Sequence, residues 1–318
     1  MKIMENMSKK MPLIGILAIA AILPQLLSTS PYYLRLITFC FFYIALASSW
    51  NIVGGIAGQP FLGMSAPFGV GGYVTMILAR YLKMPPLFGM WIGGAFSVII
   101  ALLLTPLLKL RVDLFAIGSL SVPIIFMLYF YTTEAFGSCN GISMPPDSFY
   151  NETLIAYIFL LLALSAVLVN YKIINSDIGV MMRAIANNPE LATASGINIF
   201  YLKFLALLIS SFFIGVLGGM YSYYMLSVLP ETAFDIFWAI QTMLMCIIGG
   251  MGTFLGPVIG APLIYLITTF IGTVFLGVQR LIVGIFLVLL VLFFPEGLPL
   301  ANMLMSMFAR KTGGEQNR

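Results

Sequence analysis

Long apolar stretches separated by short polar segments dominate this chain. The apolar stretches fall at about residues 13–29, 34–52, 62–81, 86–108, 114–133, 153–171, 203–224, 236–250, 257–276 and 280–294. A bilayer core about 30 Å thick needs roughly 20 apolar residues per helical span, so each stretch has about the length of one crossing. A turn is expected near Gly277, because one helix through the last two stretches would be longer than the bilayer is thick. The pattern predicts an all-α polytopic membrane helix bundle with about ten transmembrane helices in a single domain, residues 1–318.

Glycine and proline crowd two parts of this pattern, residues 54–72 and 249–262. Both residue types weaken helices and free backbone groups that lipid cannot satisfy, so such backbone belongs in a protein interior or beside a water-filled cavity. Interrupted segments in the two halves of a membrane chain are typical of a transport pathway. The second and seventh stretches run in opposite directions, which favours an inverted repeat. Two alternatives stay open: close helix packing through small residues, and re-entrant segments at 62–81 and 257–276, which would leave eight spans.

We expect the translocation pathway to follow these two interrupted segments. Its predicted residues are Asn51, Gly58, Gln59, Gly63, Gly69, Gly249, Gly250, Gly252, Gly256 and Pro257. Ser65, Gln241 and Thr242 are further polar groups that the pattern places inside the bundle. For Gln59 the alternative to substrate contact is an interhelical hydrogen bond.

Composition narrows the possible chemistry. Only 8% of the residues are charged, against about 25% in a soluble domain, and the mean hydropathy is +1.06, so a water-soluble enzyme is excluded. The sequence has no histidine, which excludes a histidine-based metal site, a histidine general base and a Ser-His-Asp triad. The net charge of +4 is too scattered to form a nucleic-acid surface.

The basic residues indicate the orientation. With the N-terminus inside, the outer segments hold only Arg35, Arg80, Lys83 and Arg280 of the 15 Lys and Arg residues. The loop at 134–152 carries acidic residues and no basic one, as expected outside. The distribution predicts that both termini lie in the cytoplasm and that the first stretch remains as an uncleaved span.

The longest inner loop, residues 172–200, predicts a capped helical hairpin. Residues 177–187 form an amphipathic pattern. Asn188 suits an N-cap, Pro189 the first position of a second helix, and Glu190 its positively polarised end. Gly196 can end that helix in the left-handed conformation. Such a hairpin could dock a partner protein, and the alternative is an amphipathic stretch that lies on the membrane surface.

The energy source is expected to lie outside the chain. No ionisable residue falls near the centre of a predicted span, which argues against a proton-coupled carrier, whereas sodium coupling through backbone carbonyls stays open. The sequence contains no Gly-x-x-x-x-Gly-Lys-Ser/Thr loop to hold ATP phosphates. It also offers no converging acid, base or nucleophile within the spans, so we do not expect an enzyme.

Four strings stand in order between about residues 49 and 298: SWNIVGGIAGQPFLGMSAPFGVGGYV, GVMMRAIANNPELATASGIN, IIGGMGTFLGPVIGAPLI and VLFFPEGL. Together they resemble the successive hallmarks of the LivM-type permeases of bacterial branched-chain amino-acid ABC importers. The resemblance implies a multi-pass inner-membrane permease subunit that forms the pathway for branched-chain or related small amino acids. It also implies a second, LivH-like permease subunit, two ATPase subunits that hold ATP and Mg, and a periplasmic substrate-binding protein, with no cofactor in this chain.

Part of the hairpin resembles the Glu-Ala-Ala-x-x-x-Gly signature by which importer permeases contact their ATPases. The resemblance implies a coupling role for Arg183, Ala184, Asn188, Pro189, Glu190, Ala192 and Gly196. Leu191 replaces the first alanine of the signature, and Glu296 replaces a usual arginine in the last string. Pro60 and Met64 stand where relatives more often have small or polar residues, which leaves the substrate open. An ion-coupled secondary carrier of small polar solutes and a passive channel are the alternatives.

Overall fold

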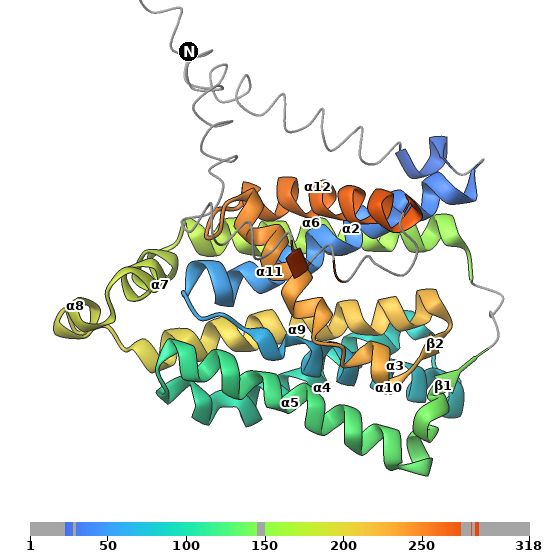
Figure 1. The fold of residues 1–318 in the computed structure, drawn as a ribbon, viewed down its shortest axis with the longest axis horizontal. Helices are drawn as coiled ribbons and strands as arrows, with labels where there is room; N and C mark the ends of the chain where they lie inside the picture. Colours follow the sequence, from blue (N-terminus) through green and yellow to red (C-terminus); the bar gives the residue numbers. More distant parts are fainter. Residues whose placement is uncertain (1–22, 28–29, 145–149, 275–280, 282–283, 286–318) are drawn as a thin grey trace, which may run out of the picture.

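The chain forms a bundle of long helices (Figure 1). The computed structural model describes residues 23–27, 30–144, 150–274, 281, 284 and 285. Within this described part, 8 helices are long and apolar enough to cross a membrane. The predicted all-α polytopic fold is therefore confirmed. The predicted first and last spans, 13–29 and 280–294, fall mostly outside the described residues, as do both termini.

The helix boundaries follow local sequence signals. The long helices are α2 (Pro31–Asn51), α3 (Ser65–Tyr81), α4 (Pro86–Leu104), α5 (Val112–Thr132), α6 (Glu152–Ile174), α9 (Ile199–Met225), α11 (Phe237–Gly249) and α12 (Leu255–Val274). Shorter ones are α7 (Asp177–Asn187), α8 (Pro189–Ala194), α10 (Pro230–Ala233), a π-helical segment (Ile52–Ile56) and 3₁₀ segments at Leu62–Met64, Thr105–Lys109, Glu134–Phe136 and Ser138–Asn140. Pro31 and Pro86 begin α2 and α4, where the missing N–H costs no hydrogen bond. Asn151 and Asn198 cap α6 and α9 by accepting backbone N–H bonds.

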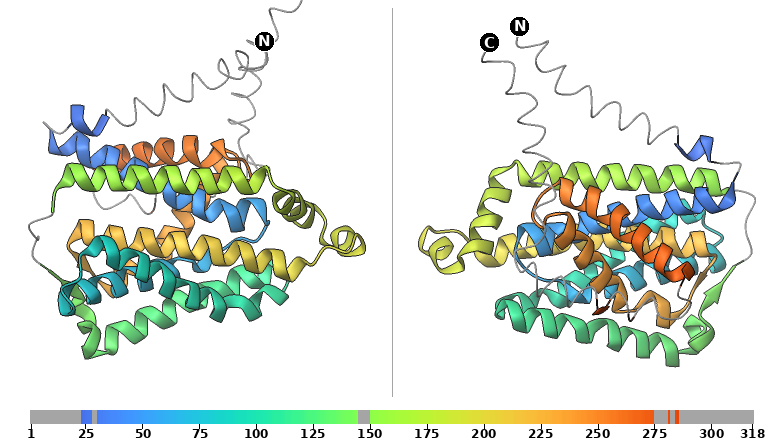
Figure 2. Two further views of the ribbon diagram at one scale, coloured as in Figure 1. Left: turned by 180° about the vertical axis from the view of Figure 1, so that it is seen from behind. Right: turned by 45° about the horizontal axis from the view of Figure 1, so that its top comes forward.

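The helices pack in two groups (Figures 1 and 2). Helix α2 packs against α6 and α12, whereas α3, α4 and α9 pack closely against one another. The apolar window of α3 is 78% buried, but that of α5, at the edge of the bundle, is only 22% buried. Leu114, Ile117, Ile125 and Leu128 of α5 are exposed, as expected for a helix that faces lipid. The most deeply buried spans are therefore those of α3 and α2, and the apolar window of α2 is 72% buried.

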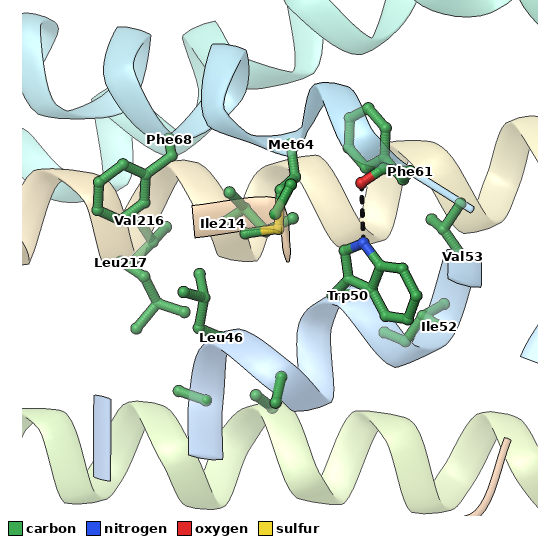
Figure 3. Close-up of a cluster of buried hydrophobic side chains, with 14 of the residues drawn as sticks. Leu46, Trp50, Ile52, Val53, Phe61, Met64, Phe68, Ile214, Val216 and Leu217 are labelled. Atoms are coloured by element: carbon green, nitrogen blue, oxygen red, sulfur yellow. Dashed lines mark hydrogen bonds between the residues drawn. The ribbon is translucent and has the colours of Figure 1, made fainter. Parts of the chain in front are cut away.

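Buried side chains of α2, α3, α9 and the segment after α2 meet in the centre (Figure 3). Trp50 and Phe61 lie within this cluster, and Met64 and Phe68 extend it toward Ile214 of α9. These large side chains are at most 1% exposed. The core thus forms around the point where α2 ends and the chain turns toward α3.

The two ends of the bundle differ. At one end, here called the hairpin end, α7 and α8 project beyond the long helices (Figure 1). At the other, called the strand end, β1 (Ile142–Ser143) pairs antiparallel with β2 (Ser227–Val228). The Arg80 guanidinium donates to the Ser143 carbonyl (3.1 Å) and so joins α3 to this small sheet.

The interrupted segments include helices of very different length. Leu62–Tyr81 and Leu255–Thr273 are long and apolar enough to cross a membrane, so their length favours crossing over re-entry. Helix α11 has only 13 residues and rises about 20 Å, which is less than the bilayer core. With α10 it forms the candidate span Pro230–Gly249. This span is discontinuous, and the inverted repeat stays a prediction.

Candidate functional site

The two glycine-rich segments meet through one side chain. We call residues 54–72 the first break and residues 249–262 the second break. Asn51 is buried at the end of α2, just before the first break. Its Nδ2 donates to the Thr253 carbonyl (2.9 Å), and its Oδ1 accepts from the Gly252 N–H (2.9 Å). One amide therefore satisfies both a donor and an acceptor of the second break and joins the two breaks.

Backbone conformation explains the glycines of the second break. Gly250 and Gly252 have φ angles of 109° and 75°, which other residues rarely adopt. Gly249 and Gly256 lie backbone against backbone, since a Cβ on Gly249 would collide with the Gly256 carbonyl. Pro257 is buried in the first turn of α12. Residues 250–254 of the second break therefore form a tight turn between α11 and α12.

Two glycines of the first break lie directly against neighbouring segments of the chain. Gly63 donates its N–H to Ser119 Oγ of α5 (3.1 Å), and a Cβ on Gly63 would collide with the Ser119 carbonyl. Gly69 lies against the ring of Phe234 in the same way. These contacts leave no room for any side chain at either glycine.

Gly58 connects the first break to the hairpin. Its φ angle is 64°, and a Cβ built on it would lie 2.6 Å from the Cβ of Ala186 in α7. Helix α7 thus rests on the backbone of the first break. This contact was not expected from the sequence, because neither residue type reveals a distant partner.

Two large polar side chains near the first break differ in their partners. Trp50 Nε1 donates to the Phe61 carbonyl (2.8 Å; Figure 3), which satisfies one backbone group of the irregular segment. Gln59 is 0% exposed, and neither its Oε1 nor its Nε2 has a hydrogen-bond partner among the described residues. Burial of an unpaired amide is costly. The hydrogen bond to Phe61 therefore accounts for the buried N–H group of Trp50, whereas no contact among the described residues accounts for the buried amide of Gln59.

Most of the predicted pathway residues make contacts typical of close helix packing, which the sequence left open as an alternative. None of them lines the cavity described next. Their part in translocation stays a prediction, and Gln59 is the one whose buried amide keeps capacity for a partner.

A cavity of about 280 Å³ opens between α2, α9, α11 and α12. We call it the strand-end cavity, because α10, which contributes to it, lies beside β2 (Figure 1). Its lining residues are Tyr43, Tyr221, Thr232, Asp235, Phe237, Trp238, Gln241, Tyr265 and Thr268. Within it, the Tyr43 hydroxyl donates to Gln241 Oε1 (3.3 Å), and Asp235 Oδ1 accepts the Phe237 N–H (2.9 Å).

The sequence identified little of this cavity. Gln241 was expected inside the bundle, and the structure places it there, 3% exposed. The aromatic residues could not be singled out, because tyrosine and tryptophan inside an apolar stretch look like ordinary core residues. Tyr43 and Gln241 also lie 198 positions apart in the chain. A high density of aromatic residues on α2 was the one available signal.

The hairpin forms with the predicted boundaries. Helix α7 covers Asp177–Asn187, with Met182 and Ile185 buried on its inner side. Arg183 lies on this helix, and its guanidinium donates to the Ile174 carbonyl (2.9 Å) at the end of α6. Arg183 therefore fastens α7 to α6 within this chain. This bond accounts for the position of Arg183, and its implied coupling role stays a prediction.

The caps of α8 match the sequence signals. Asn188 Oδ1 accepts the N–H groups of Glu190 and Leu191 (both 3.1 Å), and Pro189 takes the first position. At the other end Gly196 has φ 80° and donates to the Thr193 carbonyl (2.9 Å). The Ile197 N–H donates to Ala192, which completes a Schellman motif. The helix is short but fixed at both ends.

The exposed surface of the hairpin differs from the expected one. Ala192 is only 3% exposed and packs inside the chain, whereas Leu191 beside it is 66% exposed. Glu190 is exposed, and Ala184 is half-buried. Five residues of α8 are therefore exposed to an outside partner, Pro189, Glu190, Leu191, Thr193 and Ala194, whereas Ala192 supports the helix from within.

A groove of about 720 Å³ lies beside the hairpin. We call it the hairpin groove, and its lining residues are Leu108, Lys109, Leu110, Arg111, Val112, Asp113, Asn187, Asn188, Pro189, Glu190, Ile199 and Lys203. It combines the α4–α5 junction with the α7–α8 turn and the start of α9. Basic and acidic groups from three elements thus surround one concave surface.

Comparisons with known proteins agree with this architecture. The family model described as branched-chain amino acid transport system / permease component matches residues 32–294. The chain is 25% identical, over 98% of its length and 80% of the relative, to the high-affinity branched-chain amino acid transport system permease protein LivM of Salmonella typhimurium. It is 24% identical to the Escherichia coli LivM over 92% of this chain and 76% of the relative.

A probable branched-chain amino acid transport permease protein LivH of Methanocaldococcus jannaschii is 26% identical over 72% of this chain and 79% of the relative. No solved structure gives a significant match. The family match covers the breaks, the hairpin and the strand-end cavity alike. The chain therefore belongs to the family of permease components of branched-chain amino acid transport systems.

Proposed function

We propose that this chain is one permease subunit of an ATP-driven importer, and that it receives movement from ATPase subunits through the α7–α8 hairpin. Such an importer needs a second permease subunit, related to LivH or identical to this chain, two ATPase subunits that hold ATP and Mg, and a periplasmic binding protein. The chain itself would hold no cofactor. The solutes would be branched-chain or related small amino acids.

The observation that carries the proposal is the capped hairpin at one end of the bundle. A coupling element has to be rigid, and here Asn188 and Gly196 fix both ends of α8 while Arg183 fastens α7 to α6. It also has to reach the transmembrane part, and Ala186 of α7 lies directly against Gly58. Glu190 and Leu191 present charge and an apolar side chain to the outside.

The proposed orientation places the hairpin end in the cytoplasm of a bacterial inner membrane, with both termini on that side. Most of the basic residues then face the cytoplasm.

Cys139, near β1 at the strand end, is exposed, whereas Cys246 is buried. A membrane-impermeant thiol reagent should label wild-type spheroplasts and not a Cys139→Ser variant. Labelling of a cysteine introduced at Ala194 in intact spheroplasts would overturn this orientation.

The coupling role is tested with charge reversal at matched positions. Glu190 and Glu152 are both exposed acids in the first turn of a helix, at opposite ends of the bundle. Glu190→Lys should lower ATP hydrolysis of the purified complex about tenfold, because it opposes the helix dipole and reverses the presented charge. Glu152→Lys should leave hydrolysis unchanged.

A second variant tests the shape of the hairpin rather than its charge. Gly196→Val should strain the left-handed cap by about 1–2 kcal/mol. No atom lies within 4 Å of a Cβ at this glycine, so the rest of the fold should be unaffected. The variant should insert normally and lose ATPase association. Normal hydrolysis and uptake in both hairpin variants would refute the coupling role.

A further inference from the structure

Lys203 is a buried cation at the hairpin end of the bundle. It is the fifth residue of α9 and only 7% exposed, whereas the other lysines and arginines of the described residues are exposed or half-buried. It makes no hydrogen bond or ion pair with any described residue. Lysine is almost never buried unless it is paired, because an unpaired buried charge is costly. The ammonium group of Lys203 therefore needs an anionic partner from outside the described part of the chain.

Two other basic residues line the hairpin groove together with Lys203. Lys109 belongs to the α4–α5 junction, and its ammonium lies over the Phe200 ring (5.8 Å), so it is held against the start of α9. Arg111 precedes α5, and no side chain caps that helix. The positively polarised end of α5 therefore adds to the basic potential of the groove.

The acidic groups of the groove do not neutralise Lys203. Asp113 and Glu190 line the same groove, yet both are exposed, and neither forms an ion pair with another described residue. Each stands in the first turn of its helix, α5 or α8, where the positive end of the helix dipole offsets a carboxylate. The groove therefore keeps an excess of positive charge around one buried cation.

We propose that the hairpin groove binds an anionic phospholipid and that Lys203 holds its phosphate group. A lysine ammonium donates to a phosphate oxygen in a charge-assisted hydrogen bond, which is stronger than one between neutral groups. Basic pockets between transmembrane helices near the membrane surface recognise the headgroups of anionic lipids in this way. The volume of about 720 Å³ admits a whole headgroup.

Depth and surroundings favour a lipid over an acidic protein surface. Lys203 lies about 6 Å along the candidate span Ile199–Met225, which is close to the depth of lipid headgroups. The groove also continues onto the exposed apolar side of α5. Ile117 lies one turn beyond Asp113 on the same face of α5, and Ile117 and Leu114 are 65% and 51% exposed. Acyl chains can therefore lie along α5 while the phosphate reaches Lys203.

The test measures the unfolding temperature of the full chain in lipid nanodiscs of two compositions. One contains only dioleoylphosphatidylcholine, whose headgroup carries its own cation, and in the other about one third of this lipid is replaced by dioleoylphosphatidylglycerol. For the wild type the anionic lipid should raise the unfolding temperature by about 3 °C or more, because a ligand that binds only the folded state stabilises it. Inorganic phosphate added to the phosphatidylcholine nanodiscs should give no such shift.

Lys203→Met is the decisive variant, since methionine keeps an unbranched, flexible side chain and removes the charge. This variant should lose the response to the anionic lipid. In phosphatidylcholine alone it should unfold at the wild-type temperature or above, because it no longer buries an unpaired ammonium group. Lys172→Met is the control: this lysine is exposed in the last turn of α6, at the same end of the bundle, and its variant should keep the wild-type response.

An equal response of Lys203→Met and the wild type to the anionic lipid would overturn this proposal. So would a variant that is less stable than the wild type by the same amount in both compositions, because Lys203 would then have an anionic partner within the chain. A full shift with inorganic phosphate alone would assign the groove to free phosphate instead of a lipid. If Lys203→Met responds normally to the lipid but loses ATPase association, the groove docks a protein and the lipid assignment fails.

Discussion

The first break and the strand-end cavity are both irregular regions inside one bundle, yet they are built in opposite ways. In the first break, Gly63 lies against the Ser119 carbonyl of α5 and Gly69 against the Phe234 ring, so no space remains at either position. In the cavity, large aromatic side chains hold α2, α9, α11 and α12 around an open space. The comparison teaches that the glycines of the first break mark close contact, and that open space is lined by residues large enough to keep helices apart.

The largest effect should follow from filling the first break. Gly63→Ala places a Cβ against the Ser119 carbonyl, so the variant should lose about 1–3 kcal/mol of stability and much of its folded yield. Gly118→Ala is the matched control, since its nearest neighbour is Leu107 Cδ2 at an ordinary 3.5 Å. Fluorescence-detected size-exclusion chromatography measures both. Equal folded yields for the two variants would show that the first break can accommodate a Cβ at Gly63.

The next largest effect on stability concerns the two hydrogen bonds by which Asn51 connects the breaks. Asn51→Leu removes both hydrogen bonds to the second break and leaves the Gly252 N–H and the Thr253 carbonyl unpaired. Gly252 and Thr253 are only half-buried, so water replaces part of what is lost, and a net cost of about 1 kcal/mol should lower the unfolding temperature. Asn175→Leu changes an exposed residue at the end of α6 and should have little effect. An unchanged unfolding temperature for Asn51→Leu would mean that the two breaks are held together by other contacts.

The smallest effect on stability is expected at Gln59. Its amide is buried without a partner among the described residues, so Gln59→Met should leave the unfolding temperature unchanged or raise it by the equivalent of about 1 kcal/mol. Uptake by the complex should nevertheless fall if the amide contacts the solute during transport. A clear loss of stability would show that the amide is hydrogen-bonded in the folded protein, and the first break would then be packed throughout.

Local signals in the sequence predicted the spans and the hairpin well. Helix length follows from apolar composition, and Asn188 and Gly196 act on their own backbone within a few residues. Such short-range physics can be read from one chain without knowing the fold. For this reason the boundaries of α7 and α8 agree with the sequence pattern.

Contacts between distant segments could not be predicted in the same way. The wall of the strand-end cavity depends on which faces of α2, α9, α11 and α12 meet, and nothing in Tyr43 or Tyr265 specifies that. Ala192 is buried inside the chain, and the sequence around it does not specify which side of α8 faces the bundle. The glycine-rich segments predicted a transport pathway with close helix packing as the alternative, and at Gly63 the structure contains close packing.

The contact between Gly58 and Ala186 has a thermodynamic consequence. With no space for a side chain between them, a shift of α7 toward the bundle has to displace the first break, and a rearrangement of the first break has to displace α7. Free-energy coupling between two sites is reciprocal. If ligands at the hairpin stabilise one arrangement of the membrane helices, solutes held among those helices must change the affinity of the hairpin by the same factor.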